Sequence, residues 1–182
     1  MNINLKKGFT LVELLIVIAI LGTLAVVVLI ALNPVQQLAR TRDAGRQSTV
    51  TQLGHAMEAW ATVHGGVYPS TSGTAPLNCA NGGWIQNCLV LGGEIQTVPS
   101  AVAYSSGTGG NCTTSGTGNV QNGFCYEVAG GNALIFAQAE ALSNRNRCTG
   151  ANIAYFVYSS ADGRGGIICS GNPNPGAQTF VQ

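Results

Sequence analysis

Charged residues are scarce in this chain. Only 8% of its 182 residues are Asp, Glu, Lys or Arg, whereas a typical soluble domain has about 25%. Lysine occurs only at Lys6 and Lys7, so the chain beyond residue 8 carries six arginines against seven carboxylates, a net charge of −1. Such a composition provides no broad basic face, which argues against a dedicated nucleic-acid-binding module.

The common catalytic and metal-binding motifs are also missing. The sequence has no phosphate-binding glycine loop, no HExxH motif and no Ser, His and Asp pattern typical of hydrolases. Its two histidines, His55 and His64, have one glutamate nearby, Glu58, and no cysteine. The sequence therefore predicts no enzyme activity, no cofactor and no metal site.

Cysteine is confined to the C-terminal part of the chain. No two of the six cysteines have C-x-x-C spacing, and an even count in a Gly- and Asn-rich region favours disulfides formed in an oxidising compartment. A structural zinc site is the competing interpretation. Among the possible connectivities we prefer sequential pairing, because each pair then encloses one short loop or hairpin: Cys79–Cys88, Cys112–Cys125 and Cys148–Cys169.

A long apolar run follows the two lysines. Between Leu14 and Leu32 there is no charged residue, and a helix from Phe9 to Leu32 would be about 36 Å long, enough to cross a bilayer. Lys6 and Lys7 favour a cytoplasmic N-terminus, so the rest of the chain would lie outside. A plain membrane anchor explains the length and the lysines. It does not explain Glu13, whose burial in lipid requires a partner or protonation.

The stretch KKGFTLVELLIVIAILGTLAVV, from Lys6 onward, closely resembles the N-terminus of type IV pilins and pseudopilins. The resemblance implies that a membrane prepilin peptidase cuts between Gly8 and Phe9, and that the new amine of Phe9 is N-methylated. It also implies that the mature chain waits in the inner membrane until the pilus or secretion machinery assembles it into a helical filament. In that filament the Glu13 carboxylate would pair with the Phe9 amine of a neighbouring subunit and fix the axial register.

The helical region is not uniform. Gly22 weakens a helix by about 1 kcal/mol relative to Ala, and Pro34 cannot donate to the carbonyl of Ile30. Asn33 is a good N-cap and Pro34 fits a first helical position, so either a kink or two consecutive helices is expected at Asn33–Pro34. Filaments of the resembling family often melt the segment between glycine and proline, which here would run from Gly22 to Pro34.

Beyond Pro34 the pattern becomes amphipathic. An apolar stripe with helical spacing is expected to pack on a sheet, and it consists of Val50, Leu53, Met57 and Trp60. The charged residues before the stripe, Arg40, Arg42, Asp43 and Arg46, are expected to form a solvated polar turn near the lipid headgroups, with contacts between filament subunits as the alternative. Gly65 and Gly66 end the helix.

The remainder reads as a small head with an antiparallel sheet of about four strands. We expect strands at 123–128, 133–139, 153–159 and 166–169, with Gly130–Gly131 and Asp162–Gly163 in turns. The predicted fold is α+β, a long helix packed on this sheet with disulfide-stapled loops. The predicted segments are a leader (1–8), a membrane-spanning or filament-core helix (9–33), an amphipathic helix (34–64) and the head (65–182).

The sequence thus predicts a structural filament subunit. The first interpretation is a major pilin of a type IV pilus serving adhesion, motility or DNA uptake, located in the cytoplasmic membrane and then in a surface filament. The second is a pseudopilin of a type II secretion or competence system, forming a periplasmic pseudopilus. If Arg145, Arg147 and Arg164 converge on the head, repeated display along a filament would allow a weak contact with DNA phosphates.

Overall fold

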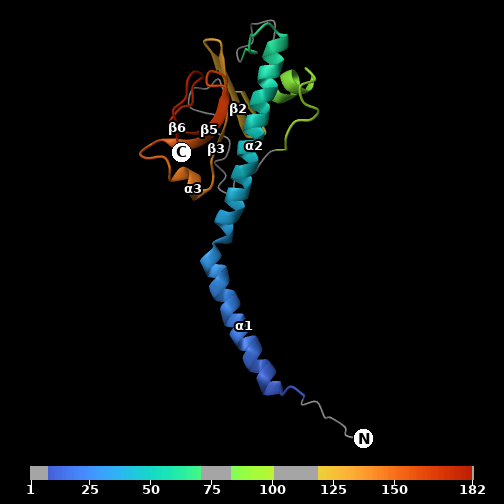
Figure 1. Ribbon diagram of the computed structural model, residues 1–182, viewed down its shortest axis with the longest axis vertical. Helices are drawn as coiled ribbons and strands as arrows, with labels where there is room; N and C mark the ends of the chain where they lie inside the picture. Colours follow the sequence, from blue (N-terminus) through green and yellow to red (C-terminus); the bar gives the residue numbers. More distant parts are fainter. Residues whose placement is uncertain (1–7, 71–82, 101–118, 182) are drawn as a thin grey trace. The chain divides into compact units, whose positions relative to one another are not determined.

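The computed structural model describes residues 8–70, 83–100 and 119–181 (Figure 1). The contacts divide the chain into two units, Met1–Leu38 and Ala39–Gln182. Helix α1 spans Leu11–Leu32 in the first unit, and helix α2 spans Pro34–Val63, most of it in the second. The sequence pattern therefore predicted the long helical region correctly.

The second unit contains a six-stranded antiparallel sheet in the order β1-β2-β3-β4-β5-β6. The prediction of about four strands was too low, because the two edge strands are only three and two residues long and show no periodicity in the sequence. The strands are β1 (Asn119–Gln121), β2 (Phe124–Ala129), β3 (Asn132–Gln138), β4 (Ile153–Ser159), β5 (Arg164–Ser170) and β6 (Phe180–Val181).

The turn signals placed the central hairpins correctly. Gly130 and Gly131 have φ angles of 59° and 78° and connect β2 to β3 where Ala129 pairs with Asn132. Positive φ at both central residues is the geometry that a two-residue hairpin turn requires. At the end of the sheet β6 pairs with β5, so the turn-rich C-terminal tail folds back on the head.

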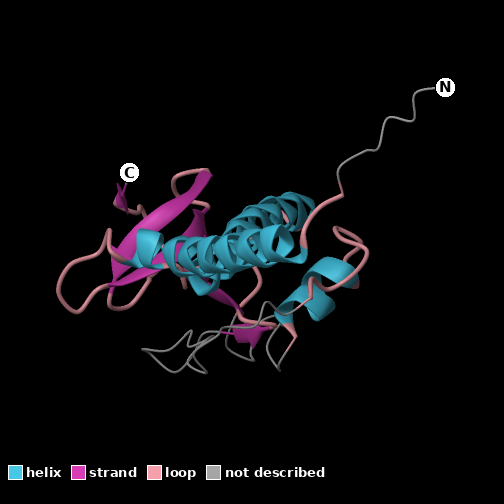
Figure 2. Ribbon diagram, turned by 90° about the horizontal axis from the view of Figure 1, so that it is seen from below, coloured by secondary structure: helices cyan, strands magenta, loops and turns pink. Residues whose placement is uncertain are grey.

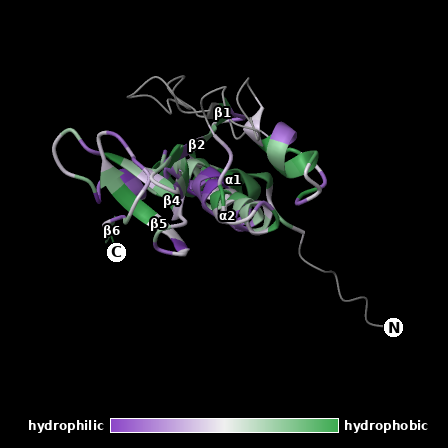
Figure 3. Cartoon of the chain, turned by 90° about the horizontal axis from the view of Figure 1, so that it is seen from above, coloured by the Kyte–Doolittle hydropathy of each residue, from purple (hydrophilic) through white to green (hydrophobic). Residues whose placement is uncertain are grey.

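The main core lies between α2 and one face of the sheet. The predicted stripe of Val50, Leu53, Met57 and Trp60 is at most 3% exposed and packs against alternate residues of the strands, including Tyr126, Ile135 and Phe156. Figure 2 shows the strands beside the helix, and Figure 3 shows hydrophobic residues along the sheet. Apolar side chains that recur with the helical period of 3.6 residues thus pack against apolar side chains at every second position of the strands.

The opposite face of the sheet is buried as well. A second cluster there is formed by the other alternate residues, with Phe180 of β6 packed against it: Cys125, Leu134, Phe136, Tyr155, Val157 and Ile168. Glu127 lies on this face, opposite Leu134 in the β2–β3 pair, and is 8% exposed. Its Oε1 atom has no hydrogen-bond partner in the part of the chain that the structure describes. Loss of hydration raises the pKa of the Glu127 carboxyl.

The described part of the head also contains two short helices. The π-helix η1 (Ile85–Val90) buries Ile85 and Leu89, and its first backbone N–H donates to the side-chain oxygen of Gln121 at 2.7 Å. Helix α3 (Leu142–Arg145) follows β3.

The predicted Cys148–Cys169 disulfide is present, and it joins the segment after α3 to β5. Cys88 and Cys125 are also disulfide-bonded. Cys79 and Cys112 lie outside the described residues, so the other two predicted pairings stay predictions.

A buried ionic network connects α2 to the segment between β3 and α3. Arg46 is 1% exposed, and its guanidinium donates to Asp43 at 2.7 Å and to Glu140 at 3.0 Å. Arg42 also donates to Glu140, from Nε to Oε2 at 2.9 Å. The Asp43 carboxylate accepts the backbone N–H groups of Glu140 and Ala141, each at 2.9 Å. One buried cluster therefore determines where the chain leaves β3 and enters α3.

This network corrects an expectation from the sequence. Asp43 and Arg46 were predicted to be solvated near the lipid headgroups, whereas each is 1% exposed. The partner residue, Glu140, lies 94 positions from Arg46 in the sequence, so no local pattern indicates the contact. Among the four charged residues of that turn, only Arg40 is exposed, and Arg42 is half-buried.

We predict that Gly54→Ala destabilises the head. Gly54 lies on α2 where a Cβ atom would overlap the buried ring of Tyr158 in β4, and such overpacking costs about 1–3 kcal/mol. The control is Gly45→Ala on the same helix, where the added Cβ meets no atom of the described residues within 4 Å outside its own turn of helix, and a gain of about 1 kcal/mol is expected. Urea unfolding of the full chain in detergent, followed by tryptophan fluorescence, measures both. Equal effects of the two substitutions would contradict the prediction.

We predict that Arg46→Gln destabilises the head far more than Arg40→Gln. The first substitution leaves Asp43 and Glu140 without their buried cation, a loss of about 3–5 kcal/mol. The second makes the same chemical change at an exposed position of the same helix, where about 0.5 kcal/mol or less is expected. The same unfolding assay compares the two. A small effect at Arg46 would show that the network contributes no stability.

We predict that Glu127→Gln stabilises the head at neutral pH. Burial raises the pKa of Glu127 in the folded state, so the folded chain binds its proton more tightly than the unfolded chain. The stabilising contribution of this carboxyl is complete below the unfolded pKa of about 4.3, and it is lost as the pH rises through the folded pKa. The variant should therefore gain stability over the native chain at pH 7 and not below pH 4. Unfolding curves across this range test it, and a pH-independent difference would refute it.

Candidate functional site

The two predicted cleavage residues, Gly8 and Phe9, are exposed in the structure. Gly8, Phe9 and Thr10 precede α1, and Phe9 is 81% exposed. Apart from its two neighbours, no atom of the described residues lies within 4 Å of a Cβ added at Gly8. The chain itself therefore does not require glycine at this position.

Glu13 and Thr10 form a capping box at the start of α1. The Thr10 hydroxyl accepts the Glu13 backbone N–H at 3.2 Å, and the Glu13 Oε2 accepts the Thr10 backbone N–H at 2.8 Å. The Thr10 hydroxyl donates to the same carboxylate oxygen at 2.7 Å. Two backbone N–H groups that no helical carbonyl reaches are satisfied in this way.

Thr10 was missed by the sequence analysis. The signal was present, because Thr10-Leu11-Val12-Glu13 has the spacing of a capping box, T-x-x-E. The consequence for Glu13 is that its charge is held close to the residue that follows Phe9. The carboxylate therefore has a local role within one subunit, separate from the pairing with a neighbour that the resemblance implies.

Helix α1 exposes its whole surface within its own unit. It has 22 residues, its most apolar 18-residue window has a mean hydropathy of 3.2, and none of its residues is buried. A soluble surface helix would bury one apolar stripe, whereas this one is apolar all round, as a membrane span or a filament core requires. By length and composition it is able to cross a membrane.

Of the two residues predicted to break the helix, Gly22 and Pro34, only Pro34 lies at an interruption. Helix α1 runs without interruption through Gly22. It ends at Leu32, where Asn33 has a φ of 41°, and α2 then begins at Pro34. The Asn33 side-chain oxygen accepts the backbone N–H of Gln36 at 3.4 Å, the contact expected of an N-cap. Pro34 thus occupies a first helical position, where its missing N–H costs nothing.

The three arginines proposed for a weak DNA contact do not converge. Arg145 and Arg147 lie in and just after α3, close to the first residue of β4, whereas Arg164 pairs with Ser159 at the other end of that strand. The seven residues of β4 span about 20 Å. Arg164 also lies over the ring of Phe180, 4.0 Å from its centroid.

The histidines do not gather with other metal ligands. The His55 ring nitrogen Nδ1 lies 3.8 Å from Glu58 and 3.3 Å from the Tyr158 hydroxyl, while His64 stacks on Trp60. Across the described ranges, no group of three or more His, Cys, Asp or Glu side chains is placed to hold a metal ion.

Comparison with known proteins identifies the N-terminal segment. A family model described as the prokaryotic N-terminal methylation motif matches residues 3–29. No curated protein and no solved structure shows significant similarity to the chain. The match covers the cleavage residues, the capping box and most of α1, which are the features described above. The chain therefore carries the class III prepilin-type leader and methylation motif of type IV pilins and pseudopilins.

Proposed function

We propose that the chain is the major subunit of a type IV pilus, assembled from the inner membrane into a surface filament for adhesion, motility or DNA uptake. The observation that carries the proposal is an apolar helix with no buried residue and with an exposed carboxylate in its first turn, and both the carboxylate and most of the helix lie within the matched methylation motif. Such a surface needs lipid before assembly and other copies of itself afterwards. Filament assembly supplies both environments in turn.

Within this proposal each N-terminal residue has one task. Prepilin peptidase cuts between Gly8 and Phe9, and Gly8 is needed because a side chain would crowd the peptidase rather than this chain. The Phe9 amine is methylated and stays charged. In the dry filament core it pairs with Glu13 of a neighbouring subunit, because two charges that are costly alone are tolerated together when they are paired. Melting of the helical segment between Gly22 and Pro34 would accompany assembly.

The alternative is a pseudopilin that forms a short periplasmic filament in a secretion or competence system. The feature in its favour is Gly65-Gly66-Val67-Tyr68-Pro69 after the long helix, which looks like the equivalent point of the major pseudopilin of type II secretion. The disulfides of the head, in contrast, favour the pilus, because they suit an exposed fibre. Electron microscopy of material sheared from cells separates the two. Long fibres containing this chain support the pilus, and their absence favours the pseudopilus.

We predict that Glu13→Ala and Glu13→Gln are processed normally but both fail to assemble filaments. Gln retains the acceptor that a capping box uses, so a shared defect assigns the role to the charge. Thr10→Ala makes the converse change: it removes the Thr10 hydroxyl that caps α1, a loss of about 1 kcal/mol, and it keeps the carboxylate. This variant should therefore still assemble.

The readouts are precursor and mature bands on a gel and the yield of sheared filaments. Gly8→Arg serves as the control for blocked cleavage and should leave only precursor. Normal filaments from Glu13→Gln with none from Glu13→Ala would show that capping, rather than charge pairing, is what assembly needs. Normal filaments from Glu13→Ala would refute the role of Glu13 altogether.

A further inference from the structure

The arginines of the second unit (Ala39–Gln182) are concentrated at one end of it. Asp43 on α2 brings two groups of arginines together, because its carboxylate accepts the backbone N–H of Ala141 at 2.9 Å and the side-chain amide of Asn144 at 2.8 Å. The two groups lie about 100 positions apart in the sequence, so no local pattern predicts that they meet. We call this region the basic end, and its arginines are Arg40, Arg42 and Arg46 of α2 together with Arg145 and Arg147 in and just after α3.

The acids of the basic end do not neutralise it. Asp43 and Glu140 form ion pairs with Arg42 and Arg46, and five arginines against two acids leave a net charge of +3. The rest of the second unit has one arginine against four acids, a net charge of −3. The unit is therefore strongly polarised, although its arginines and acids balance in total. The arginines of the basic end that are exposed are Arg40, Arg145 and Arg147.

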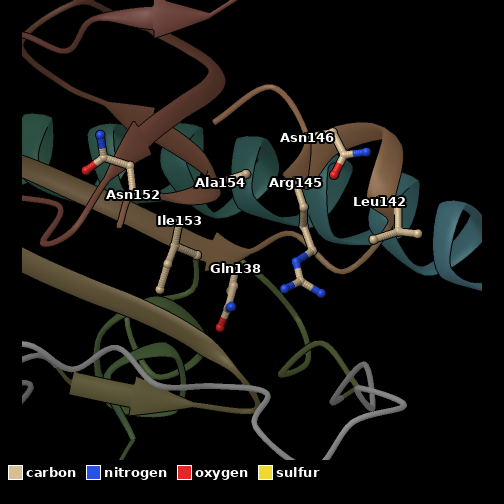
Figure 4. A pocket seen from close by; sticks show the side chains of 7 residues that line it. All are labelled: Gln138, Leu142, Arg145, Asn146, Asn152, Ile153 and Ala154. Atoms are coloured by element: carbon tan, nitrogen blue, oxygen red, sulfur yellow. The ribbon is translucent and has the colours of Figure 1, made fainter. Parts of the chain in front are cut away.

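An exposed apolar side chain accompanies these arginines. Leu142 on α3 is 46% exposed, and Figure 4 shows it on the same short helix as Arg145, with α2 behind. Cationic and apolar side chains together are typical of segments that lie at a membrane interface, where the cations meet the headgroups and the apolar groups enter the acyl boundary.

The basic end includes the point where the chain enters the second unit from α1. Arg40 is the second residue of that unit and follows the last residue of α1 by eight positions. Eight helical residues cover about 12 Å, and the headgroup layer on each side of the hydrocarbon core is about 5–8 Å thick. With α1 across a bilayer, the length of the chain therefore keeps Arg40 within or just above the headgroups.

We propose that, before assembly, the basic end docks on anionic phospholipid headgroups of the leaflet from which α2 emerges, with Arg40, Arg145 and Arg147 beside the lipid phosphates. Each arginine at an anionic surface strengthens such docking about fivefold. Docking would hold the head in one orientation while α1 waits in the membrane. The proposal rests on the membrane-embedded stage of the proposed function and not on the filament that follows.

A second copy of the chain is a poorer partner for the basic end. Of the four acids elsewhere in the second unit, Glu127 is 8% exposed, and the Asp162 carboxylate already accepts from the Ser159 hydroxyl and the Gln178 backbone N–H. The other two, Glu58 and Glu94, belong to different elements, α2 and the segment after η1. These acids do not form a compact acidic surface that would match three exposed arginines.

Hydrogen exchange of the full chain in lipid nanodiscs, with one chain per disc, tests the docking. The discs contain either phosphatidylcholine alone or phosphatidylcholine with phosphatidylglycerol. The backbone N–H groups of residues 144–148 are hydrogen-bonded within α3 and the turn after it, so their exchange reports the opening of this segment. Anionic lipid should slow their exchange at least about tenfold, because more than one arginine docks, and high salt should abolish the difference.

Two matched substitutions assign the effect to the basic end. Arg147→Gln should reduce the ratio of exchange rates between neutral and anionic discs about fivefold, and the double variant Arg145→Gln with Arg147→Gln should bring it close to one. The control is Arg164→Gln, which removes an exposed arginine at the other end of β4 and should leave the ratio unchanged. Each variant is compared with itself in the two kinds of disc, so differences in intrinsic exchange cancel.

Several results would overturn the proposal. Equal exchange in both kinds of disc would do so, as would equal effects of Arg147→Gln and Arg164→Gln. Greater slowing by a short oligonucleotide in detergent micelles would assign the basic end to nucleic acid, and slowing that needs two chains per disc would assign it to a second copy. Failure of the chain to insert into discs would overturn the docking together with the proposed function, whereas failure to dock after insertion would leave the proposed filament untouched.

Discussion

The buried guanidinium of Arg46 is the constraint on which the head depends most. It lies between Asp43 on its own helix and Glu140 at the end of β3, and the three groups are held together out of water. A charge in this position is tolerated only while its partners stay in place. Asp43 in turn accepts the backbone N–H groups of residues 140 and 141. The site at which β3 gives way to α3 is thus tied to α2.

Two charged side chains, Glu13 and Arg46, are stabilised in contrasting ways. Glu13 is satisfied within its own helix by Thr10, three residues away, and remains exposed on an apolar surface. Arg46 is satisfied by a residue 94 positions distant and is sealed inside the head. The first arrangement leaves a charge exposed to another molecule, as the proposed assembly would require. The second uses charge to join elements within one molecule. In a chain with so few charged residues, both placements are informative.

Local patterns predicted much of the fold. The unbroken apolar run gave α1, the 3-4-3 spacing of Val50, Leu53, Met57 and Trp60 gave the buried stripe of α2, and the paired glycines gave the β2–β3 hairpin. The capping box of Thr10 and Glu13 was also recognisable from its T-x-x-E spacing, although the sequence analysis did not identify it. In contrast, the burial of both sheet faces was not predicted, because the second face is completed by a tail whose two-residue strand has no recognisable pattern.

The sequence by itself revealed the N-terminal methylation motif and the apolar helix, because both consist of residues that are neighbours along the chain. It also determined which helix face is apolar and where the turns occur. Only the tertiary structure decided which charges are buried, and that Arg145 and Arg164 lie toward opposite ends of β4. These outcomes depend on contacts between residues far apart in the sequence, and periodicity carries no information about such contacts.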